Sequence, residues 1–298
     1  MTLDQLRVFV AVAERQHMTR AAEALNIAQS AASVAVAALE AAHATRLFNR
    51  VGRGIELTEA GHRFLVEARA VLARAEAAEL VLAELAGLVR GVLSVQASQT
   101  IASYWLPRHL VAFRRAHPGI EIRLAVGNTA QVAAAVHEGL AELGFVEGAV
   151  EDGLLGSTTV ATDQLVLVVA PDHPWASATG LTLRDVADQG EWVLREPGSG
   201  TRSAFEAVLA ATGVSPARLR VALELPSNEA VRAAVEAGMG ATVISASVAV
   251  PSLEAGLLRQ VKLALPERAY HVLRHRERSP SRAAEALLAL IAAAAPLP

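Results

Sequence analysis

Two short helical patterns separated by a turn of three residues lie close to the N-terminus, and this arrangement constrains the fold more than any other feature. The first pattern follows Thr19, which can cap a helix, and ends before Asn26-Ile27-Ala28. The second covers residues 29–42 and repeats apolar residues at helical spacing, which predicts one buried face. Its predicted inward-facing residues are Ala32, Val36 and Leu39. Two helices joined in this way are typical of a helix-turn-helix.

A β-hairpin is expected after these helices. Apolar residues at 47–48 and 55–57 flank the segment Arg50-Val51-Gly52-Arg53-Gly54. Two glycines between short apolar strands are typical of a hairpin turn. The sequence therefore predicts a hairpin that presents Arg50 and Arg53 at its tip.

The start of the second helix has the residue types that read DNA bases. In a helix-turn-helix this end of the second helix lies in the major groove. The amide of Gln29 can bond to adenine, and the methyl group of Ala31 can meet the methyl group of thymine. Arg50 and Arg53 suit phosphates or a minor groove. Gln29 alone fits an ordinary solvated helix start better than a DNA contact, so the prediction rests on the whole set. The predicted DNA-contacting residues are Thr19, Arg20, Gln29, Ser30, Ala31, Ser33, Arg50 and Arg53.

A long helix is predicted next, with Thr58 as its cap. Its apolar residues alternate steps of four and three, at Phe64, Ala68, Val71, Ala75, Ala78, Leu82, Leu85 and Val89. Such a seam, sustained for more than three repeats, predicts that two of these helices pair. The alternative is one amphipathic helix packed on its own domain. Gly87 and Gly91 are expected to end the helix.

From about Gly91 onward, strand-like segments alternate with helical ones. The predicted strands cover residues 92–95, 120–126, 143–146, 165–170, 192–194, 220–225, 241–245 and 270–273. The predicted helices cover residues 106–117, 131–138, 203–212, 229–237 and 283–294. This alternation predicts an α/β domain with mostly parallel sheets. A domain of this length can divide into two lobes with a ligand cleft between them.

Two segments that each follow a predicted strand could form a small anion site. Ser98-Gln99-Thr100 follows the first strand, and Gly198-Ser199-Gly200-Thr201-Arg202 leads to a helix predicted to begin at Ser203. Hydroxyl groups and free backbone N–H groups at helix N-termini bind anions, and Arg202 adds a positive charge. The glycines allow close approach of the backbone to a ligand. The second segment is also consistent with a plain capped turn, and it is not a Walker A loop because no lysine follows the glycine.

The sequence resembles the LysR-type transcriptional regulators. The resemblance rests on His17-Met18-Thr19-Arg20-Ala21-Ala22-Glu23-Ala24-Leu25, on Gln29, Ser33 and Leu39-Glu40, and on Arg46-Leu47-Phe48-Asn49-Arg50, Gly52-Arg53-Gly54 and Leu57-Thr58-Glu59-Ala60-Gly61. It extends over essentially the whole chain. It implies an α/β fold with an all-α N-terminal part: a winged helix-turn-helix, a long dimerising linker helix and a two-lobed effector domain of the periplasmic-binding type. It also implies double-stranded promoter DNA, a small effector, self-association as a dimer or tetramer, and RNA polymerase as partners.

The effector domain resembles the branch of the family that regulates carbon dioxide fixation and sulfur and cysteine metabolism. The segments that carry this resemblance are Ser98-Gln99-Thr100, Gly144-Phe145-Val146-Glu147-Gly148, Arg195-Glu196-Pro197-Gly198-Ser199-Gly200-Thr201-Arg202 and Ser227-Asn228-Glu229-Ala230. By this resemblance the effector-binding residues are Ser98, Thr100, Glu147, Gly198, Ser199, Thr201, Arg202 and Asn228. A small metabolite or an inorganic oxyanion is the expected effector. Glu147 would repel a fully charged anion unless it is protonated, paired with Arg202, or facing a protonated group of the ligand.

The DNA-reading surface departs from the family pattern. Ala28 replaces the serine that often caps the recognition helix, and Val34, Ala35, Ala37 and Ala38 replace residues that are commonly basic. Residues 1–63 contain seven arginines and six acidic residues, a net charge of +1 with histidines neutral. Non-specific affinity for DNA rises with the number of phosphates neutralised. We therefore expect weak DNA binding that depends strongly on oligomerisation.

These patterns divide the chain into three parts. Residues 1–58 are the predicted winged helix-turn-helix, residues 59–90 the linker and dimerisation helix, and residues 91–298 the effector-binding domain. Within the last part, lobe 1 is predicted to comprise residues 91–162 and 267–298, and lobe 2 residues 163–266.

Several other classes of function are not indicated. There is no cysteine, no secretory signal pattern, and no apolar run of the ~20 residues that cross a membrane, so a cytoplasmic protein without a membrane partner is expected. His271 and His275 are four residues apart but have no acidic residue between them, so a metal site is not predicted. No cofactor motif and no catalytic set of residues was found, and an enzyme is therefore the weakest alternative. A second alternative is a solute sensor whose DNA-binding domain is vestigial, as Ala28 suggests.

Overall fold

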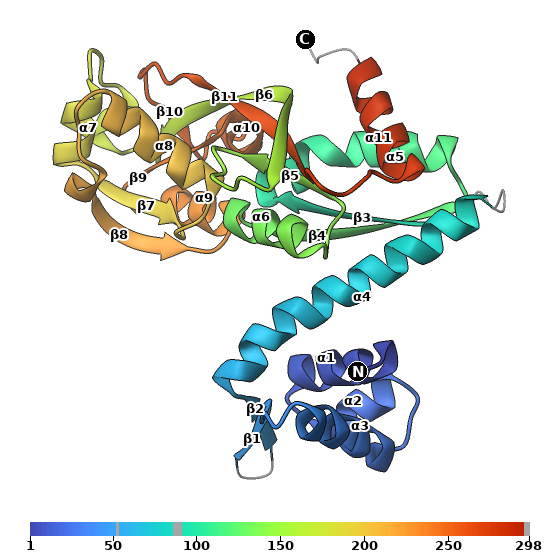
Figure 1. Cartoon of the computed structure of the whole chain (residues 1–298). Coiled ribbons are helices and arrows are strands. Elements are labelled where there is room, and N and C mark those ends of the chain that lie inside the picture. The colour runs from blue at the N-terminus through green and yellow to red at the C-terminus, as the bar shows by residue number, and fades with distance from the viewer. Residues whose placement is uncertain (52–53, 86–90, 295–298) are drawn as a thin grey trace. The chain divides into compact units, whose positions relative to one another are not determined.

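The computed structural model describes residues 1–51, 54–85 and 91–294 of the 298-residue chain (Figure 1). The contacts within the chain divide it into two compact units. The N-terminal unit is Met1–Leu88, and the C-terminal unit contains Val89–His137 and Ala141–Pro298.

The N-terminal unit contains helices and a small hairpin. Its elements are α1 (Leu3–Arg15), α2 (Met18–Ala24), α3 (Gln29–Ala42), β1 (Phe48–Val51), β2 (Gly54–Leu57) and α4 (Glu59–Leu85). The predicted helix-turn-helix is confirmed, because α2 and α3 are joined by a short turn and Ala32, Val36 and Leu39 are buried. The hairpin is confirmed as well, since β1 pairs antiparallel with β2 from Phe48 opposite Leu57 to Val51 opposite Gly54.

The cap of α2 differs from the prediction. His17, not Thr19, precedes the helix, and its Nδ1 atom accepts the backbone N–H of Arg20 at 3.4 Å. Thr19 lies inside the first turn of α2 and is exposed. The expectation failed because threonine is a common capping residue, whereas histidine caps less often and is easily overlooked.

Helix α4 begins where the sequence predicts. The hydroxyl of Thr58 accepts the backbone N–H of Gly61 at 2.9 Å, so the predicted cap is confirmed. The first two positions of the apolar seam, Phe64 and Ala68, pack against the helix-turn-helix core, with the rings of Phe64 and Phe9 4.9 Å apart. For these two residues the alternative of packing on the same domain is therefore right. Val71, which follows them, is 41% exposed.

The remaining positions of the seam do not distinguish two paired α4 helices from one helix packed on its own domain. Ala75 is half-buried and Ala78 is exposed, whereas the side chains of Leu82 and Leu85 and all of Gly87 and Val89 lie outside the described residues. Pairing of two α4 helices stays a prediction. No single described helix is long and apolar enough to cross a membrane; α2 and α3 meet that criterion only as a pair, and they are bent by 109°.

The C-terminal unit is built on one sheet with nine described strands (Figure 1). They are β3 (Gly91–Ser98), β4 (Ile120–Gly127), β5 (Leu143–Glu147), β6 (Leu155–Val169), β7 (Glu191–Arg195), β8 (Arg220–Leu225), β9 (Ala241–Ser245), β10 (Arg259–Gln260) and β11 (Glu267–His275). Their order is β4-β3-β5-β11-β6-β9-β7-β8, and β10 pairs with β6.

Parallel and antiparallel pairings are equally frequent among these strands, so the expectation of mostly parallel sheets is wrong for the sheet as a whole. The pairs β3–β4, β3–β5, β7–β8 and β7–β9 are parallel, and every pair that involves β6 or β11 is antiparallel. Strand β6 is fifteen residues long, and only its last five residues, 165–169, were predicted. Half of its first ten residues are exposed and most are polar, so this part lacks the apolar pattern that identifies a buried strand.

Helices cover both faces of the sheet. They are α5 (Leu106–Ala116), α6 (Thr129–Glu138), α7 (Leu183–Gln189), α8 (Gly200–Ala211), α9 (Asn228–Glu236), α10 (Ala246–Glu254) and α11 (Arg282–Ala293). Near one end of the sheet, α5 and α11 pack on one face and α6 on the other. Near the opposite end, α7 and α8 cover one face and α9 and α10 the other. The sequence had predicted all of these helices except α7 and α10.

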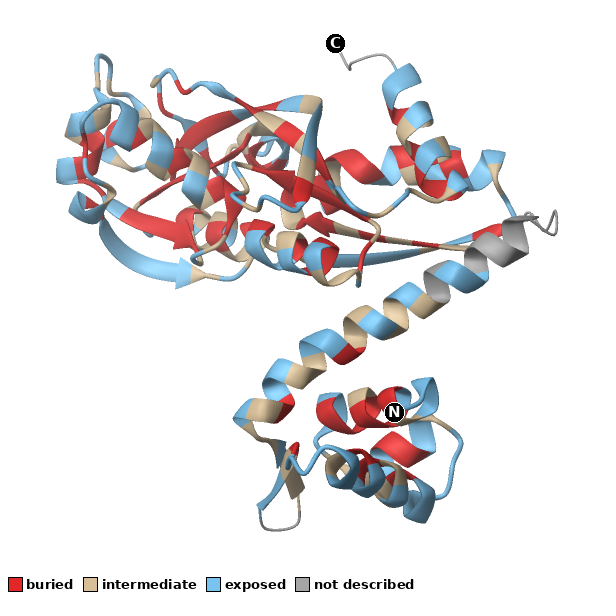
Figure 2. Ribbon diagram, in the orientation of Figure 1, coloured by how far each residue is buried: buried red, intermediate tan, exposed pale blue. Residues whose placement is uncertain are grey.

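The buried residues therefore form separate cores at the two ends of one sheet (Figure 2). Strands β6 and β11 connect these ends, since both pair with each other over most of their length. This arrangement supports two lobes, and we keep residues 91–162 with 267–298 and residues 163–266 as their proposed limits.

Candidate DNA-binding and effector-binding sites

The start of α3 presents its polar side chains to solvent. Gln29, Ser30 and Ala31 are exposed, and Ala28 provides no side-chain cap for the helix. The side-chain amide of Gln29 donates a hydrogen bond of 3.0 Å to the hydroxyl of Ser33, one turn later. This bond holds Gln29 against the helix and leaves its carbonyl oxygen available as an acceptor.

The hairpin is fixed to α3 by a carboxylate that the sequence analysis did not single out. Glu40, on α3, accepts the backbone N–H groups of Leu47 at 2.7 Å and of Phe48 at 3.1 Å. These bonds set the position of β1 relative to the recognition helix. Arg50 is exposed on β1, whereas Arg53 lies outside the described residues.

Some arginines of this unit are already paired and others are available for phosphates. Arg7 pairs with Asp4 at 2.9 Å, and Arg69 pairs with Glu14 at 2.8 Å. Among the described residues, no ion pair involves Arg20, Arg46, Arg50 or Arg63. The predicted contacts Arg20 and Arg50 thus belong to the cations that are free to meet DNA.

In the C-terminal unit, a buried arginine connects several of the predicted effector-binding residues. Arg268, on β11, donates from Nη1 to the hydroxyl of Thr201 at 3.0 Å, and the same atom lies 3.7 Å from Oε1 of Glu147. The hydroxyl of Ser98 donates to Oε2 of Glu147. All four side chains are buried, so Glu147 and Thr201 contact one cation, and Ser98 is linked to it through Glu147.

Arg268 also pairs with a second carboxylate. Its Nε donates to Oδ2 of Asp163 at 2.8 Å, and Ser245 donates to Oδ1 of Asp163 at 2.7 Å. Nη2 of Arg268 lies 2.7 Å from Oδ2 but forms no hydrogen bond with any described atom, because its N–H bonds do not point at that oxygen. Burial, together with the charge of Asp163, raises the pKa of the nearby Tyr270 phenol, which therefore stays protonated.

A second set of hydrogen bonds centres on Asn228, at the start of α9. Its amide nitrogen donates to the hydroxyl of Thr100 at 3.0 Å, and its amide oxygen accepts Nη1 of Arg195 at 2.7 Å. The side chain of Gln99 accepts the backbone N–H of Asn228 at 2.7 Å. Asn228 therefore links the end of β3 to the end of β7, and Thr100 is already bonded in this conformation.

The segment before α8 makes close contacts with the loop before α6. Asn128 donates to Glu196 at 3.2 Å, and the carbonyl of Gly198 accepts the backbone N–H of Ala130 at 3.3 Å. Burial disfavours the charged form of Glu196, yet hydrogen bonds from Arg195 and Asn128 hold its pKa below the usual value. Gly198 has φ = +86°, a conformation that glycine adopts without strain.

The N-terminus of α8 packs directly on Glu147. A Cβ atom at Gly200 would collide with the carbonyl oxygen of Glu147 and lie 2.5 Å from the hydroxyl oxygen of Thr129. The helix begins at Gly200, three residues earlier than predicted, and Ser199 occupies its N-cap position without a side-chain capping bond. Ser199 and Thr201 thus lie at the positive end of a twelve-residue helix.

Comparison with known proteins agrees with both halves of this description. Residues 3–62 match the model of the bacterial regulatory helix-turn-helix protein, lysR family, and residues 86–296 match the LysR substrate binding domain. The RuBisCO operon transcriptional regulator of Allochromatium vinosum is 34% identical over 245 residues, which cover 82% of this chain and 80% of that protein.

The chain belongs to the LysR family.

Solved structures of the family have the same fold. CbnR, a LysR family transcriptional regulator, has a TM-score of 0.71 at 24% identity and covers 98% of both chains. The CcmR regulatory domain of Synechocystis PCC6803, in complex with 2-PG, has a TM-score of 0.62 at 28% identity. The match covers 68% of this chain and 97% of that domain. The chain is thus a LysR-type transcriptional regulator with an effector-binding domain, and not an enzyme.

One predicted effector residue of this LysR regulator is engaged elsewhere. Arg202 pairs with Glu206 at 2.8 Å and Glu224 at 2.6 Å, and it donates to the carbonyl of Arg195 at 3.0 Å. The cation beside Glu147 is Arg268 instead, so the expected pairing of Glu147 with Arg202 is wrong.

Sequence reasoning missed Arg268, although β11 contains a signal. Arg268 alternates with Tyr270 and Val272 on the buried side of the strand. A charged residue on the apolar side of a period-two pattern needs a buried partner. That partner, Asp163, lies directly opposite Arg268 in the register of β6 and β11.

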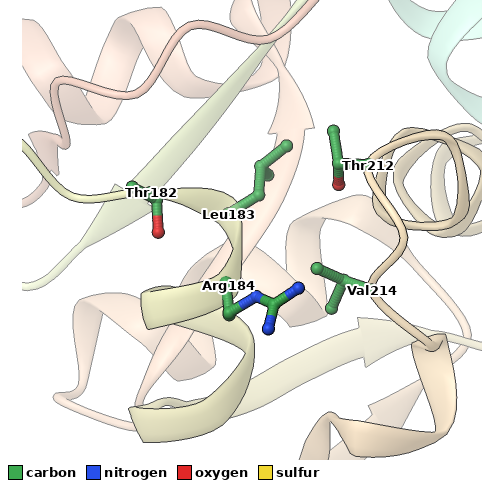
Figure 3. Close-up of a pocket in the computed structure, with 5 residues that line it drawn as sticks. All are labelled: Thr182, Leu183, Arg184, Thr212 and Val214. Atoms are coloured by element: carbon green, nitrogen blue, oxygen red, sulfur yellow. The ribbon is translucent and has the colours of Figure 1, made fainter.

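A further pocket of the C-terminal unit has a different set of lining residues. It is lined by Thr182, Leu183, Arg184, Thr212 and Val214, where α7 begins and α8 has ended (Figure 3). The hydroxyl of Thr182 is used in capping α7, and that of Thr212 donates to the carbonyl of Leu209 at 2.9 Å. This pocket therefore offers only Arg184 as an uncommitted polar group. Among the residues that the structure describes, no group of three or more metal-ligating side chains occurs.

Proposed function

We propose that this regulator binds double-stranded promoter DNA through α3 and the hairpin, and that a small anion held between the lobes changes this binding. Exposure of Gln29, Ser30, Ala31 and Arg50 supports the first part. Thr19, Arg20, Ser33 and Arg53 complete the proposed DNA contacts.

The proposal of an anionic effector rests mainly on Arg268. It is buried, and it donates to Thr201 at the N-terminus of α8. Its Nη2 is ion-paired with Asp163 at 2.7 Å but makes no aligned hydrogen bond, so a well-placed ligand oxygen would add one. Ser98, Thr100 and Ser199 add hydroxyl groups, so Arg268 joins the proposed effector-binding residues. Gly198, Asn228 and Arg202 stay in the proposal as residues that shape the segment around α8.

Glu147 restricts the kind of anion that fits. The buried set Glu147, Asp163 and Arg268 contains two acids and one base, so a fully deprotonated anion would be repelled. A ligand that also carries a hydroxyl or a retained proton can donate to Glu147 while it accepts from Arg268. We propose a hydroxy acid, a phosphorylated small acid or a partly protonated oxyanion. CcmR, whose domain is similar, was solved with 2-PG.

The proposed mechanism is a shift between conformations. The bonds from Asn228 to Thr100 and from Arg268 to Thr201 occupy groups that an effector would use. A ligand that replaces these bonds favours another arrangement of the lobes. We propose that the chain acts as a dimer or tetramer through α4, that it works in the cytoplasm on chromosomal DNA, and that RNA polymerase is a further partner.

Gel shifts and calorimetry with the full-length protein test both parts. The DNA is the intergenic region next to its own gene, and the probes are inorganic phosphate, sulfate and small hydroxy and phospho acids. A shifted band that changes with one probe is expected. Thr100→Ala and Thr201→Ala should weaken binding of that probe by roughly tenfold or more. Arg220→Ala, at an exposed ion pair with Glu191, is the matched control. Unchanged affinity in both threonine variants would refute the effector site, and lack of DNA binding would favour a solute sensor.

A further inference from the structure

The outer face of α3 is made of apolar and small side chains. The residues exposed on this side of the helix are Ser30, Ala31, Val34, Ala37, Ala38 and Ala41. At 100° per residue, Val34 points almost directly away from the buried residues Ala32, Val36 and Leu39. Val34 is 68% exposed, whereas Val36 and Leu39 on the opposite side are 5% and 1% exposed.

This face contains no charged group. The one charged residue of α3, Glu40, is bonded to the hairpin at Leu47 and Phe48. On the flank of the face, Gln29 and Ser33 are bonded to each other. Contacts made by the centre of the face must therefore be made by methyl groups.

Thymine has the one apolar group that base edges present in the major groove, its C5 methyl. Cytosine has hydrogen at the same ring position, so a methyl-lined helix distinguishes these two pyrimidines by contact alone. We propose that Val34, together with Ala31, selects thymine in the DNA that this regulator recognises. This proposal rests on the proposed DNA binding by α3, and it adds Val34 to the residues that determine specificity.

Ala31 and Val34 lie close enough on α3 to contact the same stretch of DNA. Ala31 and Val34 are three positions apart, so they are neighbours on the helix surface in its first two turns. The N-terminal half of a recognition helix is the part that reaches base edges. Burial of one methyl group between protein and base changes affinity by about fourfold. A dimer that uses two equivalent half-sites doubles the change in binding free energy, so its affinity for DNA changes by about fifteenfold.

The test removes single methyl groups from the DNA. The binding site of the full-length protein is first located by footprinting of the intergenic region or by selection from random DNA. Each thymine of a half-site is then replaced by deoxyuridine, which lacks only the C5 methyl. Affinity is measured for the wild type, for Val34→Ser and for Val250→Ser. Val250 is 43% exposed in α10 of the C-terminal unit and provides the matched control.

We expect that deoxyuridine at one or two positions weakens binding of the wild type and of Val250→Ser by about fourfold per half-site. At one of these positions, Val34→Ser should bind DNA with thymine and DNA with deoxyuridine with equal affinity. Circular dichroism verifies that the exposed substitution leaves the helix intact. Equal affinity of the wild type for thymine and deoxyuridine at every position, or unchanged discrimination in Val34→Ser, would overturn the proposal. Failure of all DNA to bind would refute the proposed function together with it.

Discussion

Replacement of Arg268 by methionine tests whether the buried ion pair between β11 and β6 is required for stability. The side chains of Arg268 and Asp163 are 6% and 4% exposed, and Nε donates to Oδ2 at 2.8 Å. Methionine fills similar space but leaves Asp163 and Glu147 buried without a cation. Loss of one partner of a buried pair costs about 3–5 kcal/mol. The free energy of unfolding of the C-terminal unit should fall by that amount.

Tryptophan fluorescence in urea is the appropriate assay. All three tryptophans, Trp105, Trp175 and Trp192, lie in the C-terminal unit, so the signal follows this unit in the full-length chain. The double variant Arg268→Met with Asp163→Asn removes the stranded carboxylate of Asp163 but not that of Glu147, and the new amide can still accept from Ser245. It should recover about 2 kcal/mol relative to additive losses.

The matched control is Arg220→Met. Arg220 pairs with Glu191 at 3.0 Å, but these side chains are 64% and 53% exposed, so the loss should stay below about 1 kcal/mol. The reasoning is refuted if Arg268→Met costs no more than the control, or if the double variant loses the full sum of its two single losses.

Three further predictions concern other contacts. Gly200→Ala should cost about 1–3 kcal/mol and change effector affinity, because its Cβ would collide with Glu147; urea unfolding and calorimetry measure this, and a neutral result would show that α8 can move away. Glu40→Ala should lower the melting temperature of the N-terminal unit and weaken DNA binding in gel shifts, since two backbone N–H groups lose their acceptor, whereas replacement of the exposed Glu56 of β2 by alanine should not. The lowered pKa of Glu196 contributes stability above the usual glutamate range; this contribution should be lost as the pH falls from about 5 toward the lowered value, and Glu196→Gln should flatten that slope in urea titrations.

Local patterns were sufficient to predict most elements of this fold. The helix-turn-helix, the hairpin and the start of α4 each depend on residues close in sequence, such as Thr58 and the buried side of α3. Residues 155–164 of β6 were missed because many of their side chains are exposed and because this part of the strand is held by its pairing with β11. Pairing between strands about 110 residues apart leaves no local pattern to detect.

The candidate effector site was only partly predicted for the same reason, because it combines residues that are distant in sequence. Ser98, Glu147 and Thr201 could be selected from motifs, and the structure places Glu147 and Thr201 beside one cation, with Ser98 bonded to Glu147. The identity of that cation could not be derived from position alone: Arg202 is close in sequence, yet its side chain is held by Glu206 and Glu224. Arg268 reaches the site through the register of two distant strands.

Strands β6 and β11 also determine which movements the C-terminal unit can make. Nine residue pairs join them in one antiparallel ladder, with an irregularity between Tyr270 and His271. A ladder of this kind twists without loss of its hydrogen bonds, whereas sliding of one strand along the other breaks them. The softest motion is therefore a rotation about the ladder, for which displacement grows with distance from it. The outermost strands β4 and β8 lie at opposite ends of the sheet, so we expect such a rotation to move these edges the most.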